Sequence, residues 1–194
     1  VDTTADNGAL TACTTAPNDC SLRGAIATAN VTTVADTIEF DATVFAGTQT
    51  ITMTGDHFRV QGGPLTINGT GANRLTINGG AGTNRIFYID TSLLTLQGMT
   101  LTGGNGTGDV SPRPTSAEGG AILSLGSGRL VANEINVTGN TSTSQGGGIY
   151  LSNGGRIENS TFSQNQASAP GGALTELGNS TIINSTFTGN TSGF

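Results

Sequence analysis

The sequence predicts an all-β protein, a parallel β-helix or solenoid of roughly seven coils with a short capping helix near its N-terminal end. Two observations predict this fold. The stretch GGALTELGNSTIINSTFTGN (Gly171–Asn190) nearly repeats the earlier stretch GGGIYLSNGGRIENSTFSQN (Gly146–Asn165). Within each unit, apolar and polar residues alternate with a period of two, which is typical of half-buried strands. Such units cannot close a core alone, but stacked units bury their inward side chains against one another.

Glycine pairs mark the repeat at nearly equal intervals: Gly119–Gly120, Gly146–Gly147 and Gly171–Gly172. Aligning on these pairs predicts an apolar column and an asparagine ladder: Val137, Phe162 and Phe187 in the first, Asn140, Asn165 and Asn190 in the second. Ladder amides that bond to the next coil would satisfy polar groups at a turn. Three solvated turn asparagines are the alternative. The same alignment places Leu130 with Ile157 and Ile182, and Arg129 with Arg156, and it leaves two extra residues in the first unit before Val137.

Earlier coils are less regular. The motif LTING occurs twice, from Leu65 and from Leu75, and LLTLQGMTLTGGNG follows from Leu93. Counting back to Ile38 gives roughly seven coils. We therefore expect a single domain over 1–194, with a cap over 1–37 and solenoid coils over 38–194.

The N-terminal stretch NDCSLRGAIATAN (Asn18–Asn30) has the only helical pattern, and it predicts a helix near 21–30. Asp19 or Ser21 is its expected N-cap. A short amphipathic helix at this position would shield the first coil from solvent and from edge-to-edge pairing. In an exported chain, Cys13 and Cys20 would form a disulfide that pins this cap; two free thiols are the alternative.

With these motifs identified, CSLRGAIATAN followed by ADTIEF resembles the start of bacterial secreted CSLREA-type β-helix proteins. The signals GGAI, FSQN and FTGN are similar to the repeats of chlamydial polymorphic outer-membrane proteins. The resemblance implies a right-handed parallel β-helix exported by a bacterium. It departs at Gly24, where the family name leads one to expect glutamate.

The composition excludes some partners. Charged residues make up 10% of the 194, there is no lysine, and the net charge is -6. An acidic chain lacks the basic face that nucleic acid requires, and no apolar run approaches the roughly 18 residues of a membrane span. We expect an extracellular or cell-surface location in bacteria.

These features favour a non-catalytic structural or adhesive solenoid, with head-to-tail self-assembly into a surface filament as one form. Expected partners are further copies, other cell-surface components or glycans. We expect no cofactor and no metal. The last coil has no recognisable cap, so a longer chain, a plug formed by Phe194, or another subunit would have to cover it.

A polysaccharide-binding or polysaccharide-cleaving enzyme is the rival class. Such chemistry needs paired carboxylates or a bound cation, and the alignment places Glu134 and Glu158 in different columns. His57 with Asp56 and Arg59 forms a polar trio of a common kind, so no catalytic residue is predicted. The loop Gly103–Glu118 is the best candidate for recognition, through Asp109, Arg113 and Glu118, and an inserted surface loop is the alternative.

A third hypothesis is ice binding. Outward positions beside the apolar column carry Thr-x-Thr-like pairs, which some ice-binding solenoids present as flat arrays. These are Thr100 and Thr102, Asn136 and Thr138, Thr161 and Ser163, and Thr186 and Thr188. The alternative is that threonine simply favours the solvated face of a strand.

Overall fold

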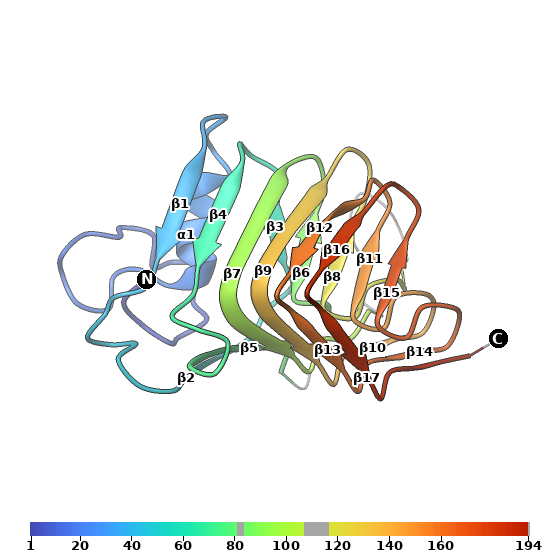
Figure 1. Ribbon diagram of the computed structural model, residues 1–194. Coiled ribbons are helices and arrows are strands. Elements are labelled where there is room, and N and C mark those ends of the chain that lie inside the picture. Colours follow the sequence, from blue (N-terminus) through green and yellow to red (C-terminus); the bar gives the residue numbers. More distant parts are fainter. Residues whose placement is uncertain (81–83, 107–116, 194) are drawn as a thin grey trace.

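The protein is a parallel β-helix of about six turns with one short helix (Figure 1), in a computed structural model that describes residues 1–80, 84–106 and 117–193. The sequence predicts roughly seven coils. The difference arises because several early turns are longer than the later repeat unit: Asp36 pairs with Leu65, and Leu94 with Leu130. The first strand begins at Asp36, and the two ends of the chain lie at opposite ends of the solenoid.

The coils stack into four strips of parallel strands. The first is β1 (Asp36–Glu39), β4 (Leu65–Asn68), the first half of β7 (Leu93–Thr102), the first half of β9 (Arg129–Thr138), β12 (Gly155–Glu158) and β16 (Thr181–Ile183). The second is β2 (Gln49–Thr52), β5 (Leu75–Asn78), the second halves of β7 and β9, β13 (Thr161–Ser163) and β17 (Thr186–Thr188). The third is β10 (Thr141–Ser142), β14 (Gln166–Ala167) and β18 (Thr191–Ser192). The fourth is β3 (Phe58–Val60), β6 (Phe87–Ile89), β8 (Ile122–Ser124), β11 (Ile149–Leu151) and β15 (Leu174–Glu176).

Alternation along each strand builds the core. In β4, Leu65 and Ile67 are buried while Thr66 and Asn68 are only partly buried. The same inward positions in the other coils form one continuous apolar cluster through the solenoid. The alternating pattern therefore decides which residues fill the interior and which face the solvent.

The glycine pairs of the repeat are explained by close backbone contacts at a corner. A Cβ on Gly147 would lie 2.3 Å from the Gly172 carbonyl oxygen, and one on Gly120 would lie 2.1 Å from that of Gly147. Gly146 has a positive φ of 65°, which glycine adopts without strain. Larger residues at these corners would push the coils apart.

The apolar column stacks in the expected register: Phe162 pairs with Val137 on one side and with Phe187 on the other. The two phenylalanine rings are stacked, with centroids 4.7 Å apart. This column continues the apolar stack through the last three coils.

The asparagines form a ladder that replaces strand pairing at a turn. The Asn165 Oδ1 accepts hydrogen bonds from the backbone N–H and the Nδ2 of Asn140, at 3.1 and 2.9 Å. Asn190 Oδ1 accepts the equivalent two bonds from Asn165, at 3.0 and 2.9 Å. Asn165 Nδ2 also donates to the Val137 carbonyl at 2.9 Å. Asn140 and Asn165 are fully buried, so these bonds satisfy groups that water cannot reach.

One part of the predicted register is wrong. Leu130 pairs with Gly155, and Ile157 pairs with Ala132, so Leu130 and Ile157 do not share a column. The cause is a turn. The span from Ile122 to its partner Ile149 is two residues longer than the span from Leu130 to its partner Gly155, so the two extra residues lie between β8 and β9.

The N-terminal cap is helix α1 (Leu22–Ala29), which covers the first coil (Figure 1). Its N-cap is Ser21, whose hydroxyl accepts a hydrogen bond from the Gly24 N–H at 2.9 Å. Leu22 and Ile26 belong to the solenoid core. The helix therefore closes the apolar interior at this end.

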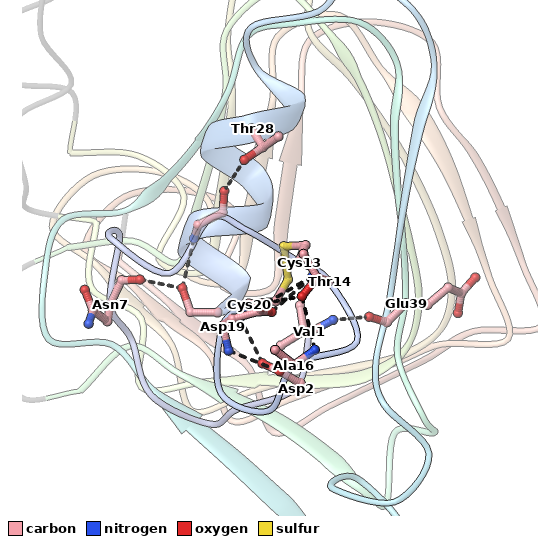
Figure 2. Close-up of a disulfide and its surroundings, with 12 residues drawn as sticks. Val1, Asp2, Asn7, Cys13, Thr14, Ala16, Asp19, Cys20, Thr28 and Glu39 are labelled. Carbon is pink, nitrogen blue, oxygen red and sulfur yellow. Dashed lines mark hydrogen bonds between the residues drawn. A yellow bond between two sulfur atoms is a disulfide. The ribbon is translucent and has the colours of Figure 1, made fainter.

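A disulfide joins Cys13 to Cys20, as predicted, and Figure 2 shows it beside α1. The Asp2 carboxylate accepts hydrogen bonds from the Cys20 and Asp19 N–H groups, at 2.9 and 3.1 Å. The Val1 ammonium group donates to the Glu39 carbonyl at 2.6 Å. A bond that closes so short a loop contributes about 2–3 kcal/mol of stability, and these contacts tie the loop to the first coil.

A close backbone contact explains why position 24 is a glycine. A Cβ at this position would lie 1.9 Å from the Leu10 carbonyl oxygen and 2.6 Å from its carbon. The segment before the helix thus crosses directly over residue 24. The glutamate that the family resemblance implies does not fit while Leu10 holds this position.

We expect Gly24→Ala to lower the free energy of unfolding by about 1–3 kcal/mol, the usual cost of overpacking. In an ordinary helix interior the same change raises it by about 1 kcal/mol. Urea unfolding followed by circular dichroism gives the sign. Ala27→Gly, at an exposed position of α1, is the matched control and should cost about 1 kcal/mol. A stabilised Gly24→Ala would contradict the crossing contact.

We expect Asn165→Ala to lower the free energy of unfolding by about 3 kcal/mol, because it leaves several buried polar groups without partners. Asn133→Ala is the control, since the Asn133 side-chain Oδ1 accepts an exposed hydrogen bond from Asn159 Nδ2 at 2.8 Å. Urea unfolding of both variants measures the difference. Equal costs for the two changes would show that the buried ladder adds nothing.

Candidate functional site

Twelve outward side chains on the second strip form two columns that run through all six turns, and we call them the threonine array. The first column is Thr50, Thr76, Thr100, Asn136, Thr161 and Thr186. The second column is Thr52, Asn78, Thr102, Thr138, Ser163 and Thr188. Every member is short, polar and uncharged, and nine of the twelve are threonine.

Bends on both sides keep the array strands equal in length. Residues with positive φ precede the first column and follow the second column. In the last four turns these are Gly98 and Gly103, Glu134 and Gly139, Asn159 and Gln164, and Asn184 and Gly189. Because four residues separate the bends each time, the Thr-x-Thr pairs stay in register from turn to turn.

Most array hydroxyls have no partner within the described chain. The Thr100 hydroxyl donates to the Ala72 carbonyl at 2.6 Å, and Ser163 donates to the Thr138 hydroxyl at 2.9 Å. Among the described residues, the other seven threonine hydroxyls make no side-chain hydrogen bond. The array members of the first and last turns are exposed, and those of the middle turns are partly buried. These hydroxyls are therefore available to an outside partner.

The adjacent first strip shares β7 and β9 with the array but carries mixed chemistry. Its outward columns are Thr37, Thr66, Thr95, Val131, Arg156 and Thr181, and Glu39, Asn68, Gln97, Asn133, Glu158 and Ile183. Arg156 and Glu158 form an ion pair at 2.5 Å. The uniformity of the array is thus a property of one strip of the sheet.

The predicted column of Arg129 and Arg156 does not exist. Arg156 pairs with Val131, and Arg129 pairs with Leu93. The two extra residues between β8 and β9 again explain the error. The prediction that Glu134 and Glu158 lie in different columns is confirmed, because Glu158 pairs with Asn133.

Of the predicted recognition loop, Asp109 and Arg113 lie outside the described residues. Glu118 is partly buried beside Arg85, a fully buried cation that the sequence analysis did not single out. The Arg85 guanidinium donates to the carbonyl oxygens of Gly106 and Glu118, both at 3.2 Å. Burial lowers the pKa of Arg85 to about 10, against the opposing effect of Glu118, so it stays charged at neutral pH. Arg85 therefore ties together the two stretches that flank residues 107–116.

The polar trio His57, Asp56 and Arg59 is spread over separate partners. The His57 ring packs edge-on against Tyr88 at 5.5 Å, and Arg59 pairs with Asp90 at 2.6 Å. Asp56 accepts a hydrogen bond from Asn84. Burial, followed by the charge of Arg85, lowers the pKa of His57 to about 4, so the imidazole is neutral at pH 7.

Asp6 and Arg23 form a salt bridge, here called the Asp6–Arg23 anchor, that holds the N-terminal segment against the first coils. The sequence analysis did not predict it. The Asp6 carboxylate accepts hydrogen bonds from Arg23 Nε at 2.6 Å and from the Thr54 N–H at 2.7 Å. The Arg23 guanidinium also lies 4.6 Å above the Phe58 ring. Burial opposes ionisation of Asp6, but the Arg23 and backbone hydrogen bonds outweigh it and lower the pKa. No local pattern signals this contact, because its members are far apart in sequence.

The last turn leaves its apolar side chains partly open. Ile182 is 45% exposed and Phe187 43%, whereas Ile157 and Phe162 in the preceding turn are fully buried. A further coil with the same repeat, from this chain or from another copy, would cover them.

The described residues contain no group of three or more His, Cys, Asp or Glu side chains placed to hold a metal ion. Within the same residues, no helix has the length and apolar character needed to cross a membrane. Comparison of the chain with known protein families, with curated proteins and with solved structures gave no match. The class of protein is therefore defined by its fold alone, a parallel β-helix with a disulfide-bonded cap.

The sequence analysis found the array in four turns and missed it in the first two. The signals were present as QTIT (Gln49–Thr52) and LTIN (Leu75–Asn78). They were overlooked because those turns do not follow the spacing of the later repeat units. The pairing of Ile51 with Ile77 places Thr50 beside Thr76 and Thr52 beside Asn78, so both turns join the array.

We expect Asp6→Asn to reduce stability at pH 7 by about 1–3 kcal/mol and to flatten its acid dependence. A carboxyl with a lowered folded-state pKa stabilises the fold above its unfolded pKa of about 3.9, and this contribution is lost as pH falls through the folded value. Urea unfolding at pH 7 and pH 3 therefore gives a smaller difference for Asp6→Asn than for the wild type. Glu158→Gln, at a more exposed ion pair, should behave as the wild type. An unchanged acid dependence in Asp6→Asn would contradict this role.

Proposed function

We propose that the chain is a non-catalytic structural or adhesive β-solenoid of the bacterial cell surface or extracellular space, and that it adheres through the threonine array. The observation that supports this proposal is the array itself, twelve short uncharged polar side chains in register over six turns. Such a face suits an extended surface better than a small ligand, for which a concave pocket with a few converging polar groups is usual.

The two strips that share β7 and β9 provide an internal comparison. Both face outward and both need residues with strand propensity. On the first strip this need is met by Thr95, Val131 and Arg156 in successive turns, so propensity alone permits variety. The restriction of the array to threonine, serine and asparagine favours a chemical role for that strip.

The disulfide supports the proposed location. Bonds between cysteines persist in non-reducing compartments, and the Cys13–Cys20 bond holds the cap of this solenoid. An extracellular position would also place the array where an external surface can reach it. Self-association at the last turn stays a prediction, supported by the exposure of Ile182 and Phe187.

Adsorption to solids tests the proposed function. Thr102→Tyr places a bulky side chain in the middle of the array while keeping strand propensity. Thr95→Tyr is the matched control, because it lies on the same strand, β7, but on the first strip. We expect the wild type and Thr95→Tyr to co-sediment with at least one solid among cellulose, chitin, bacterial cell envelopes and ice, and Thr102→Tyr to remain in solution.

Circular dichroism and melting curves of both variants check that they fold. The proposal is wrong if the wild type adsorbs to none of the four solids, or if Thr102→Tyr adsorbs as strongly as Thr95→Tyr.

A further inference from the structure

The threonine array has a periodicity that narrows the choice of surface, and this step rests on the proposed adhesive function. We propose that the array binds the surface of ice crystals, so that the ligand of this solenoid is crystalline water. Three properties of the array carry the inference: a two-dimensional repeat, rigid hydroxyls of which most have no protein partner in the described chain, and the absence of charge within it.

The repeat has two directions. Along the solenoid, members of one column lie about 4.8 Å apart, which is the distance between paired strands. Along each strand, the two members of a pair such as Thr186 and Thr188 lie about 6.6 Å apart, two strand residues on. The result is a nearly rectangular net of hydroxyl groups. Water oxygens on the prism face of hexagonal ice form a rectangular net with spacings of this order.

Threonine suits such a net because its side chain is stiff. Two heavy atoms on Cβ restrict χ1, and each in-register neighbour restricts it further. The hydroxyl can donate and accept, so it can match either orientation of a lattice water. The methyl group beside it is apolar, and contact with a solid removes its surface from liquid water. In the described chain, the hydroxyls of Thr52, Thr76 and Thr102 have no protein partner that would compete with water.

The alternatives fit less well. A charged polymer would need charged side chains, and the array has none. Aromatic side chains, which offer the faces common in ligand sites, are also absent from it; Tyr88 and Tyr150 lie on the fourth strip instead. A single hydroxyl contact contributes little net affinity on its own. The ten hydroxyls and two amides of the array acting together on one rigid surface would bind far more tightly than any one group alone.

Some array positions are not threonine, so the proposed ice binding can be tested by substituting threonine there and measuring whether binding increases. Three members depart from threonine: Asn78 in the second turn, and Asn136 and Ser163 in the fourth and fifth. The last two pair with Thr161 and Thr138 respectively. Asn136→Thr and Ser163→Thr would complete the net there. If the array binds ice, the double variant should bind it more strongly than the wild type.

The experiment measures the fraction of protein incorporated into slowly grown polycrystalline ice, together with the gap between melting and freezing temperatures of a single crystal. We expect the wild type to enter the ice and to open such a gap. Thr102→Tyr should lower the ice-bound fraction roughly tenfold, while Thr95→Tyr should leave it unchanged. The double variant should raise the fraction and widen the gap.

Each failure has a separate meaning. If the wild type is excluded from ice but adsorbs to cellulose, chitin or cell envelopes through the array, ice is overturned as the ligand and the adhesive function stands. If it adsorbs to no solid, both are overturned. If Thr102→Tyr enters ice as well as Thr95→Tyr, or if the double variant binds less than the wild type while melting at the same temperature, the array is not the ice-binding surface.

Discussion

Parallel pairing of successive turns in a fixed register is the interaction on which the rest of this structure depends. Because each residue meets its equivalent in the next turn, one alternating pattern creates a continuous apolar core inside and repeating columns outside. Bends with positive φ on both sides of the array keep the strands equal in length. Change in the length of a turn is tolerated only outside these strands, as between β8 and β9.

The turns impose a second requirement, since the backbone must leave one strip and enter the next without losing its hydrogen bonds. Asn140 and Asn165 meet it with their amides, which bond to the backbone of a neighbouring turn and to each other. Gly120 and Gly147 meet it by allowing backbones to approach where a Cβ would collide. The interior of this solenoid is therefore stabilised mainly by apolar contacts and neutral amides, with Arg85 as a fully buried cation bonded to backbone carbonyls.

The sequence predicts much of this, and the limits are physical. Period-two alternation and the repeated FxxN signal predict the Phe162 column and the asparagine ladder, because both depend only on local pattern and turn length. Aligning the repeats on their glycine pairs assigns Leu130 to the wrong column. That alignment shows that one unit is two residues longer, but it does not show where in the unit the two residues lie. The Asp6–Arg23 anchor and the buried Arg85 involve segments far apart in sequence, so no local pattern reveals them. The array is visible in the sequence wherever the repeat is regular, and its first two turns emerge only from the pairing of strands.

The same register that builds the core also decides what the outer surface can recognise. A strip whose members repeat at fixed spacing offers many identical weak contacts and no distinctive one, so it discriminates by lattice spacing and not by the shape of a single ligand. Rigidity matters here because β-branched side chains lose little rotamer freedom on contact. The apolar column that includes Phe162 lies directly beneath the array residues Thr161 and Ser163. Strand pairing thus sets the spacing of the hydroxyls outside, and the apolar column beneath them continues in the same register. In the proposed adhesive role, a surface partner would be selected by how well it matches that spacing.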